Sequence, residues 1–261
     1  MRLVVIGDIH MQGDKLWHML QDAGLADEGH RPTSSFVQDD TRLVLLGDLV
    51  HAKSRERYAD IVNARRYDEY NPRHLERAEK AQMAFLREVK GYQDRLPAEK
   101  MVILMGNHDF NAVHPEQGPL RTDDVSHLEW KVGYGGEMDE DVREWILGWP
   151  SEIIVDELHL AHVGPLQEHN NYDNGFYLEN RRRWIYEERD FLEGTPYRLG
   201  IYGHTPVRGG VNIASQGRAI LLDTNGYQDE YSYLDIEVTD RRYRLRMRGL
   251  FFDETVSRVD G

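Results

Sequence analysis

The sequence has no cysteine, no long apolar stretch and too few basic residues to balance its acids. Without cysteine the chain forms neither disulfides nor thiolate metal sites, which is compatible with the reducing cytosol. No stretch approaches the length of about 20 apolar residues that a helix needs to span a bilayer. The N-terminal apolar run over residues 3–6 is too short for a signal-peptide core, and no cleavage site follows it. We therefore expect a cytoplasmic protein that does not insert into a membrane.

Lysine and arginine number 32 against 46 aspartates and glutamates, so the formal net charge is −14. Duplex nucleic acid is bound through a basic surface, so stable nucleic-acid binding is not expected. An acidic surface also repels anionic substrates unless a local positive centre, such as a pair of bound divalent cations, overrides it. The 261 residues are enough for one large α/β domain with a buried core, or at most two small domains.

Short apolar runs rich in Val, Ile and Leu recur along the chain, and several end abruptly in Gly, Asp, Asn or His. Such runs are typical of buried strands. They cover residues 3–6, 43–46, 101–105, 158–161, 199–202 and 219–222. Helical patterns lie between them, at residues 14–23, 55–89, 139–147 and 176–192. We expect Pro72 to divide the long charged helical segment in two.

The C-terminal part has a different pattern. Residues 231–238 and 242–248 both alternate between apolar and polar side chains, which predicts an antiparallel hairpin. Four arginines, at positions 242, 244, 246 and 248, fall on one face of the second strand, and a solvated edge is the simplest reading of that face. No repeat, linker or low-complexity tract is present. We predict a single domain over residues 1–261, with a helical insertion at about 53–95.

Polar side chains directly follow several of the predicted strands. The ends of parallel strands gather along one edge of a sheet, where α/β proteins bind ligands, so these side chains can converge. Asp8 and His10 flank one residue on extended backbone and can share a cation. The other candidates are Asp48, Asn107, His162 and His204. This set of oxygen and nitrogen ligands suits Mn²⁺, Fe or Zn²⁺ better than Ca²⁺.

Each of these short motifs alone is most simply a turn, a helix cap or an ordinary histidine, and only their conjunction is specific. In order, the chain contains Gly7-Asp8-Ile9-His10, Gly47-Asp48-Leu49-Val50, Gly106-Asn107-His108-Asp109, His162-Val163-Gly164 and Gly203-His204-Thr205-Pro206. This series resembles the motifs of the calcineurin-like metallophosphoesterases, from residue 6 to about residue 226.

The resemblance implies an α/β fold, a β-sandwich of two mixed sheets flanked by helices (αββα). It implies two divalent metal ions, for which we expect Mn²⁺, with Fe, Zn²⁺ and Mg²⁺ as alternatives. Asp8 and His10 would bind the first metal and Asp48 would bridge both. The second metal would be completed by Asn107, His162 and His204. A hydroxide between the metals would attack phosphorus, and His108 would be the catalytic acid near the leaving group.

The last motif points to one branch of this superfamily. Many phosphodiesterases and nuclease members have a second His two residues after the first, where this chain has Pro206. The Gly-His-Thr-Pro form instead resembles the phosphoprotein phosphatases, a branch that includes symmetric bis-nucleosyl tetraphosphatases. Asp223 resembles the acid of a later motif in that branch. By this likeness Asp223 would orient a metal ligand, and an Asp that caps a loop is an equally simple interpretation. Asp109 is a further candidate for contacting the metal ligands from behind.

The second motif departs from that branch, which reads Gly-Asp-x-Val-Asp-Arg-Gly. His51 stands where an acid would orient the catalytic imidazole, and Ala52 stands where an arginine would grip phosphate. Lys53 and Arg55 are nearby candidates for the phosphate contact, although lysine cannot reproduce the arginine fork. Arg183 is a third candidate, in a run of three arginines of which at least two are expected to face solvent.

The resulting hypothesis is a metal-dependent hydrolase of a phosphate monoester, on a phosphoprotein or a small molecule. The alternative is a phosphoanhydride hydrolase acting on dinucleoside polyphosphates or nucleotide caps. A non-catalytic scaffold ranks lower, because all six ligands and His108 are present. A phosphodiesterase or nuclease is disfavoured by Pro206 and by the acidic charge. The remaining histidines outside the motifs, among them His127 and His159, are expected to be structural.

Overall fold

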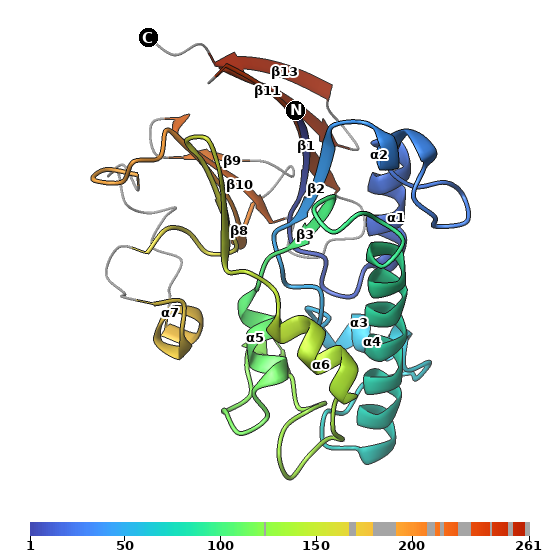
Figure 1. The fold of residues 1–261 in the computed structure, drawn as a ribbon. Helices are drawn as coiled ribbons and strands as arrows, with labels where there is room; N and C mark the ends of the chain where they lie inside the picture. Colours follow the sequence, from blue (N-terminus) through green and yellow to red (C-terminus); the bar gives the residue numbers. More distant parts are fainter. Residues whose placement is uncertain are drawn as a thin grey trace.

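The computed structural model describes residues 1–122, 124–166, 171–179, 192–207, 212–214, 217–223, 231–240, 242–249 and 253–258. Two mixed β-sheets pack face to face, and most of the helices lie along the outer side of the first sheet (Figure 1). This is the predicted α/β sandwich. Each strand that was predicted from an apolar run is present within the described residues.

The first sheet has six strands in the order β13-β12-β11-β1-β2-β3. Its strands are β1 (Arg2–Ile6), β2 (Thr41–Leu45), β3 (Met101–Ile103), β11 (Ser232–Thr239), β12 (Arg242–Gly249) and β13 (Asp253–Arg258). β1, β2 and β3 are parallel, so their carboxyl ends lie at the same edge. β11 and β12 form the predicted hairpin, and β13 adds an antiparallel strand that the alternation did not predict.

The second sheet has five strands in the order β6-β7-β8-β10-β9. They are β6 (Glu152–Val155), β7 (Leu158–Ala161), β8 (Leu199–Pro206), β9 (Asn212–Ala214) and β10 (Ala219–Asp223). β7, β8 and β10 are parallel, and the two outer strands are antiparallel to their neighbours. β8 continues four residues beyond its predicted end, so His204 lies within the strand rather than after it. β4 (Arg121–Thr122) and β5 (Val125–Ser126) form a separate small ribbon.

The apolar side chains form two buried clusters, one on each face of the first sheet. Leu3 and Val5 belong to the cluster between the sheets, together with Leu160 of the second sheet. Val4 and Ile6 belong to the cluster under the helices. Successive strand side chains point to opposite faces. Both faces of β1 are therefore buried, which explains why its sequence is an unbroken apolar run rather than an alternating one.

The helices are α1 (Gly13–Asp22), α2 (Ser34–Gln38), α3 (Arg55–Ile61), α4 (Pro72–Gln93), α5 (Asn107–Val113), α6 (Glu140–Leu147) and α7 (Asn174–Glu179). Pro72 divides the charged segment as expected, because it occupies the first turn of α4 while the Asn71 side chain accepts a hydrogen bond from the Arg73 amide. Of the helix predicted at 176–192, residues 180–191 lie outside the described residues. In the part of the chain that is described, no helix combines the length and hydropathy needed to cross a membrane.

Candidate metal centre

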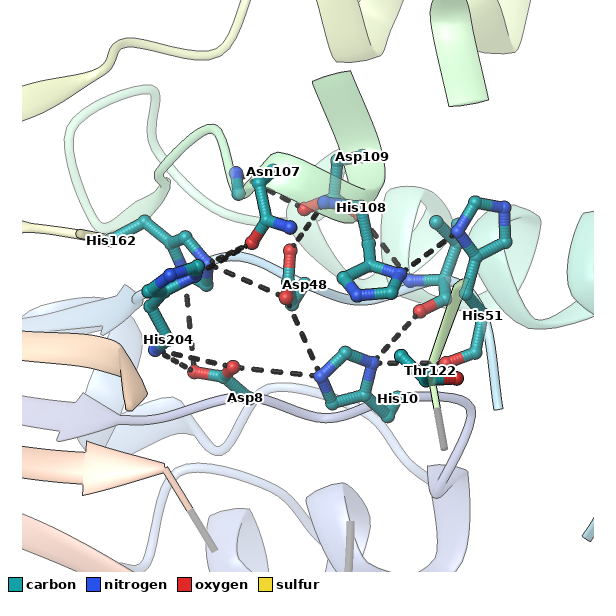
Figure 2. A network of polar contacts seen from close by, with 12 residues as sticks. Asp8, His10, Asp48, His51, Asn107, His108, Asp109, Thr122, His162 and His204 are labelled. Carbon is teal, nitrogen blue, oxygen red and sulfur yellow. Dashed lines mark hydrogen bonds and ion pairs between the residues drawn. The ribbon is translucent and has the colours of Figure 1, made fainter. Parts of the chain in front are cut away.

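The six predicted ligands converge where the strands of both sheets end (Figure 2). Asp8 and His10 follow β1, Asp48 follows β2, and Asn107 begins α5 just after β3. From the second sheet, His162 follows β7 and His204 comes from β8. Residues separated by almost 200 positions thus meet at one place, because the parallel strands of each sheet deliver their carboxyl ends to it.

Asp48 is at the centre of this group. Its Oδ2 atom lies 3.4 Å from His10 Nε2 and 3.4 Å from His162 Nε2. The Oδ2 atom of Asp8 lies 3.5 Å from the same nitrogen of His10. Asn107 Oδ1 lies 3.0 Å from His162 Nε2 and 2.9 Å from the Nδ1 atom of His204. The potential ligand atoms therefore face a common centre, with the Asp48 carboxylate between two groups of neighbours.

The other ring nitrogens hold the imidazoles in place. His10 Nδ1 lies 2.9 Å from the backbone oxygen of His51, and His162 Nδ1 lies 2.8 Å from that of Leu46. A carbonyl oxygen can only accept a hydrogen bond, so Nδ1 of both rings carries the hydrogen. In the neutral tautomer this leaves the Nε2 lone pair directed at the centre, which is the arrangement typical of metal-bound histidines.

The backbone of the site is held in unusual conformations. His10, Asp48, His51 and His204 all have positive φ, between 46° and 62°. Left-handed backbone costs energy for residues other than glycine and tends to gather at functional sites. The close packing of the β8 backbone against Asp8 also explains why position 203 is a glycine. A Cβ atom on Gly203 would lie 2.2 Å from Asp8 Oδ1. The chain packs too tightly around the carboxylates for a larger residue there.

Asp109 supports the loop that carries Asp48, and Asp223 lies at the end of a strand of the second sheet. The buried Asp109 carboxylate accepts hydrogen bonds from the backbone amides of Leu49 and Val50, in the loop that carries Asp48. Burial, followed by the nearby Asp48 charge, raises the pKa of Asp109 above its usual range. Asp223 is fully buried at the end of β10, where its backbone oxygen accepts a hydrogen bond from the Val207 amide at 2.8 Å.

The electrostatics of the site favour a cation. Burial opposes charge on the His162 imidazole, but the carboxylates of Asp48 and Asp8 outweigh burial and raise its pKa to about 10. Asp8 and Asp48 are buried, and buried carboxylates need a positive partner. His10 Nε2 is also buried and has no hydrogen-bond partner among the described residues. Carboxylate oxygen, amide oxygen and imidazole nitrogen thus form a donor set that fits divalent metal ions.

His108 lies beside this centre within a group of buried histidines. Its backbone amide donates to Asp48 Oδ1 at 2.8 Å, and its Nδ1 atom lies 3.1 Å from the Nδ1 atom of His51. His127 stacks on His51 with an interplanar angle of 5° and 4.3 Å between the ring centroids. Burial lowers the pKa of all three imidazoles well below the usual value. His127 is expected from the sequence to be structural, because no motif surrounds it.

The three predicted phosphate contacts differ in their surroundings. The Lys53 charge reaches His108 and His204, whose pKa values are lowered first by burial and further by this cation. The guanidinium of Arg55 instead pairs with the buried carboxylate of Glu69 and donates to the backbone oxygen of Asp124. Arg183 lies outside the described residues. Of the two candidates within the described residues, Lys53 is therefore the one whose positive charge acts on His108 and His204.

The profile of the family Calcineurin-like phosphoesterase matches residues 1–254, which is nearly the whole chain. The chain belongs to this family, and phosphoester hydrolysis is the activity that this membership supports. No curated protein matches the sequence significantly.

Solved structures of a metallophosphoesterase and of two phosphatases share the fold. A metallophosphoesterase from Sphaerobacter thermophilus is 18% identical, with a TM-score of 0.50 over 95% of this chain and 88% of that one. A cold-active protein tyrosine phosphatase is 13% identical, with a TM-score of 0.54 over 94% and 75%. A protein serine/threonine phosphatase from Saccharomyces cerevisiae is 12% identical, with a TM-score of 0.50 over 100% and 81%. At such identities these likenesses concern the fold alone.

Proposed function

We propose that the protein is a binuclear metal-dependent phosphatase that hydrolyses a phosphate monoester of a phosphoprotein or a small molecule. One observation carries this proposal: two buried carboxylates, an amide oxygen and three imidazoles face a common centre, and His108 lies at its side. This arrangement can hold cations next to an imidazole that can donate a proton, and both would speed the cleavage of a phosphate ester.

Each ligand has a role in the proposal. Asp8 and His10 would hold one metal ion, Asp48 would bind both, and three further residues would complete the second: Asn107, His162 and His204. Mn²⁺ suits this donor set, with Fe, Zn²⁺ and Mg²⁺ as alternatives. Bound cations would neutralise the phosphoryl oxygens and lower the pKa of the water that attacks phosphorus.

The remaining groups would bind the substrate and move its proton. Because the Nδ1 atom of His108 faces His51, its Nε2 atom is the nitrogen that would donate a proton to the departing oxygen. The Lys53 ammonium would bind a phosphoryl oxygen as a point charge. The Asp48 carboxylate holds the amide of His108, so the proposed acid and the central ligand keep a constant separation.

Two substitutions test these roles separately. Asp48→Asn should abolish hydrolysis and weaken metal retention, because the variant loses the central negative charge. His108→Ala should retain the metal but lose rate by about a hundredfold, and it should lose least on substrates with good leaving groups. Metal content and turnover should be measured on the same preparations. Near-normal turnover of Asp48→Asn with metal bound would contradict the proposal, and loss of metal from His108→Ala would contradict the role of His108.

A phosphoanhydride, such as a dinucleoside polyphosphate or a nucleotide cap, is the second candidate substrate. It is favoured over a phosphoprotein because the arginine with which phosphoprotein phosphatases bind phosphate is absent. The fully buried Ala52 stands at that position, and the nearby Arg55 is paired with Glu69. The Mn²⁺-loaded enzyme should be assayed side by side on a phosphopeptide, a mononucleotide and diadenosine tetraphosphate. Absence of activity on all three with metal bound would favour the scaffold hypothesis.

A cytoplasmic location stays a prediction.

A further inference from the structure

We infer that His127 is a positioning residue for His108, and that it acts by holding the ring of His51 against it. The inference rests on the proposed role of His108 as the acid. It assigns a function to a histidine that lies outside every motif of the sequence. It also connects Tyr58 of α3 and Thr122 of β4 to the catalytic site, because both contact His127.

His51 is held from several sides. Its Nδ1 atom meets His108 Nδ1 at 3.1 Å, and its backbone amide donates to Gln82 Oε1 of α4 at 2.8 Å. The face of its ring is covered by the parallel ring of His127, 4.3 Å away. The His108 ring stands at 74° to His51 and at 75° to His127, with centroids 5.2 Å and 5.1 Å away. His108 therefore rests against both rings of the stack.

The ring of His127 is itself fixed by two hydrogen bonds in its own plane. Its Nδ1 atom lies 3.0 Å from the hydroxyl of Tyr58, in α3, and its Nε2 atom lies 2.9 Å from Thr122 Oγ1, in β4. Two anchors on the two nitrogens prevent the imidazole from rotating or tilting. Tyr58 is fully buried and stacks on Tyr67, with 4.5 Å between the centroids, so the first anchor is also rigid.

This support matters because His51 stands where an acid would otherwise face the catalytic imidazole. A histidine at this position does not provide the permanent negative charge of a carboxylate, and its Nδ1 atom faces the Nδ1 atom of His108. A neutral hydrogen bond is weaker than the charge-assisted bond that a carboxylate would make. The orientation of His108 then depends more on packing, and the stacked rings of His51 and His127 together form the surface against which it packs.

A third metal site is the competing explanation, because His51, His108 and His127 each have a nitrogen within 4.8 Å of the others. Imidazole binds a metal through a lone pair in the plane of its ring. The parallel rings of His51 and His127 direct their lone pairs in parallel planes, which cannot meet at one ion. Both nitrogens of His127 also have hydrogen-bond partners already. The stack therefore fits a positioning role better than ligation.

His127→Ala tests the inference, with His159→Ala as its matched control. His159 is also fully buried, stacks on a tyrosine and has two hydrogen-bond partners, Tyr202 and Glu152, but it lies in the second sheet. Both variants and the wild type should be assayed with Mn²⁺ on an alkyl phosphate, which has a poor leaving group, and on nitrophenyl phosphate. We expect His127→Ala to lose about tenfold in kcat on the alkyl ester, far less on the aryl ester, with little change in KM. His159→Ala should show no such difference between substrates.

The decisive measurement repeats His127→Ala in a His108→Ala background. If His127 acts through His108, the second substitution should cause no further loss, whereas a general structural role would give the same loss in both backgrounds. Thr122→Val and Tyr58→Phe remove one anchor each without emptying the core, and they should reproduce a smaller leaving-group effect even if His127→Ala folds poorly.

Three outcomes would overturn the inference. His127→Ala could match His159→Ala on both substrates, its loss could persist in the His108→Ala background, or its metal content could fall, which would favour the third metal site. A wild-type enzyme that hydrolyses neither ester with metal bound would instead overturn the proposed function on which the inference rests.

Discussion

The carboxylate of Asp109 accepts a hydrogen bond from the backbone amide of Leu49, sixty residues earlier in the chain, with 3.0 Å between the two atoms. The same oxygen lies 3.3 Å from the amide nitrogen of Val50. Asp109 belongs to α5, which also begins with Asn107 and His108. One buried side chain thus joins the helix that carries two predicted functional residues to the loop that carries Asp48.

The first prediction concerns this connection. Asp109→Ala would leave the buried amides of Leu49 and Val50 without an acceptor, which should lower the free energy of unfolding by about 2 kcal/mol or more. Because the Asp48 loop would lose its anchor, retention of Mn²⁺ should also fall. Asp109→Asn keeps one oxygen acceptor and should lose less of both. Urea unfolding and metal analysis of the two variants test this, and equal behaviour of Ala and Asn would contradict it.

The second prediction concerns Gly203. A methyl group there would lie 2.2 Å from Asp8 Oδ1, so Gly203→Ala should displace the Asp8 carboxylate or the β8 strand. We expect metal affinity to fall by about tenfold or more, as when the supporting contacts of a metal ligand are disturbed. Isothermal titration with Mn²⁺ measures this directly.

Gly91→Ala is its control. Gly91 lies within α4, and a Cβ atom added there would meet nothing within 4 Å. Alanine favours helix over glycine by about 1 kcal/mol, so this variant should be slightly more stable and should bind metal like the wild type. Unchanged Mn²⁺ affinity in Gly203→Ala would show that the site tolerates displacement of Asp8.

The third prediction separates Lys53 from Arg55. Lys53→Met should raise KM for a phosphate monoester by about tenfold, because a charge-assisted contact to phosphate is lost, with little change in stability. Arg55→Met should leave the Glu69 carboxylate buried without its cation, with an expected loss of about 2 kcal/mol in unfolding free energy. Steady-state kinetics and denaturation should be measured on both variants. We expect KM to change in Lys53→Met and the unfolding free energy to change in Arg55→Met. A raised KM in Arg55→Met alone would reverse the assignment of the phosphate contact.

The fourth prediction concerns pH and the buried Glu129. Burial raises the pKa of this carboxyl to about 7 from a value of 4.5. The folded state therefore binds the proton more tightly than the unfolded state. The protonated Glu129 carboxyl therefore leaves the folded state at its full stability below pH 4.5. As the pH rises from 4.5 towards 7, the free energy of unfolding falls by about 3 kcal/mol in all. Glu129→Gln should remove this loss and flatten the unfolding free energy between pH 5 and 7.

Glu137→Gln is the control for that measurement, because Glu137 is exposed and close in sequence. The same pH series on this variant shows what removing an exposed carboxyl does to the unfolding free energy. If Glu129→Gln retains the wild-type slope between pH 5 and 7, then Glu129 is ionised in the folded protein throughout this range.

The strands and the main helices could be predicted because their signals are local. β1 is an apolar run because both of its faces are buried, and β11 and β12 alternate because one side of that part of the sheet faces outward. β13 was missed because its pairing with β12 depends on a neighbour rather than on its own pattern. The six proposed ligands could be predicted for a related reason, since four of them directly follow a motif glycine and the other two, His10 and His162, lie within three residues of one.

The contacts around His108 could not be read in the same way. His51, His108 and His127 come from three loops and helix ends whose relative positions depend on the packing of α3, α4 and α5. Nothing within a few residues of His127 indicates that its ring will lie flat on His51. Likewise, the sequence around Arg55 and Lys53 makes both residues candidates for binding phosphate. Only the ion pair between Arg55 and Glu69, which tertiary structure brings together, distinguishes them. Local sequence determined the strands, their end residues and so the chemistry of the centre, because each is fixed by a short motif. Tertiary structure decided which neutral and charged side chains surround that centre, because those contacts join segments that are distant along the chain.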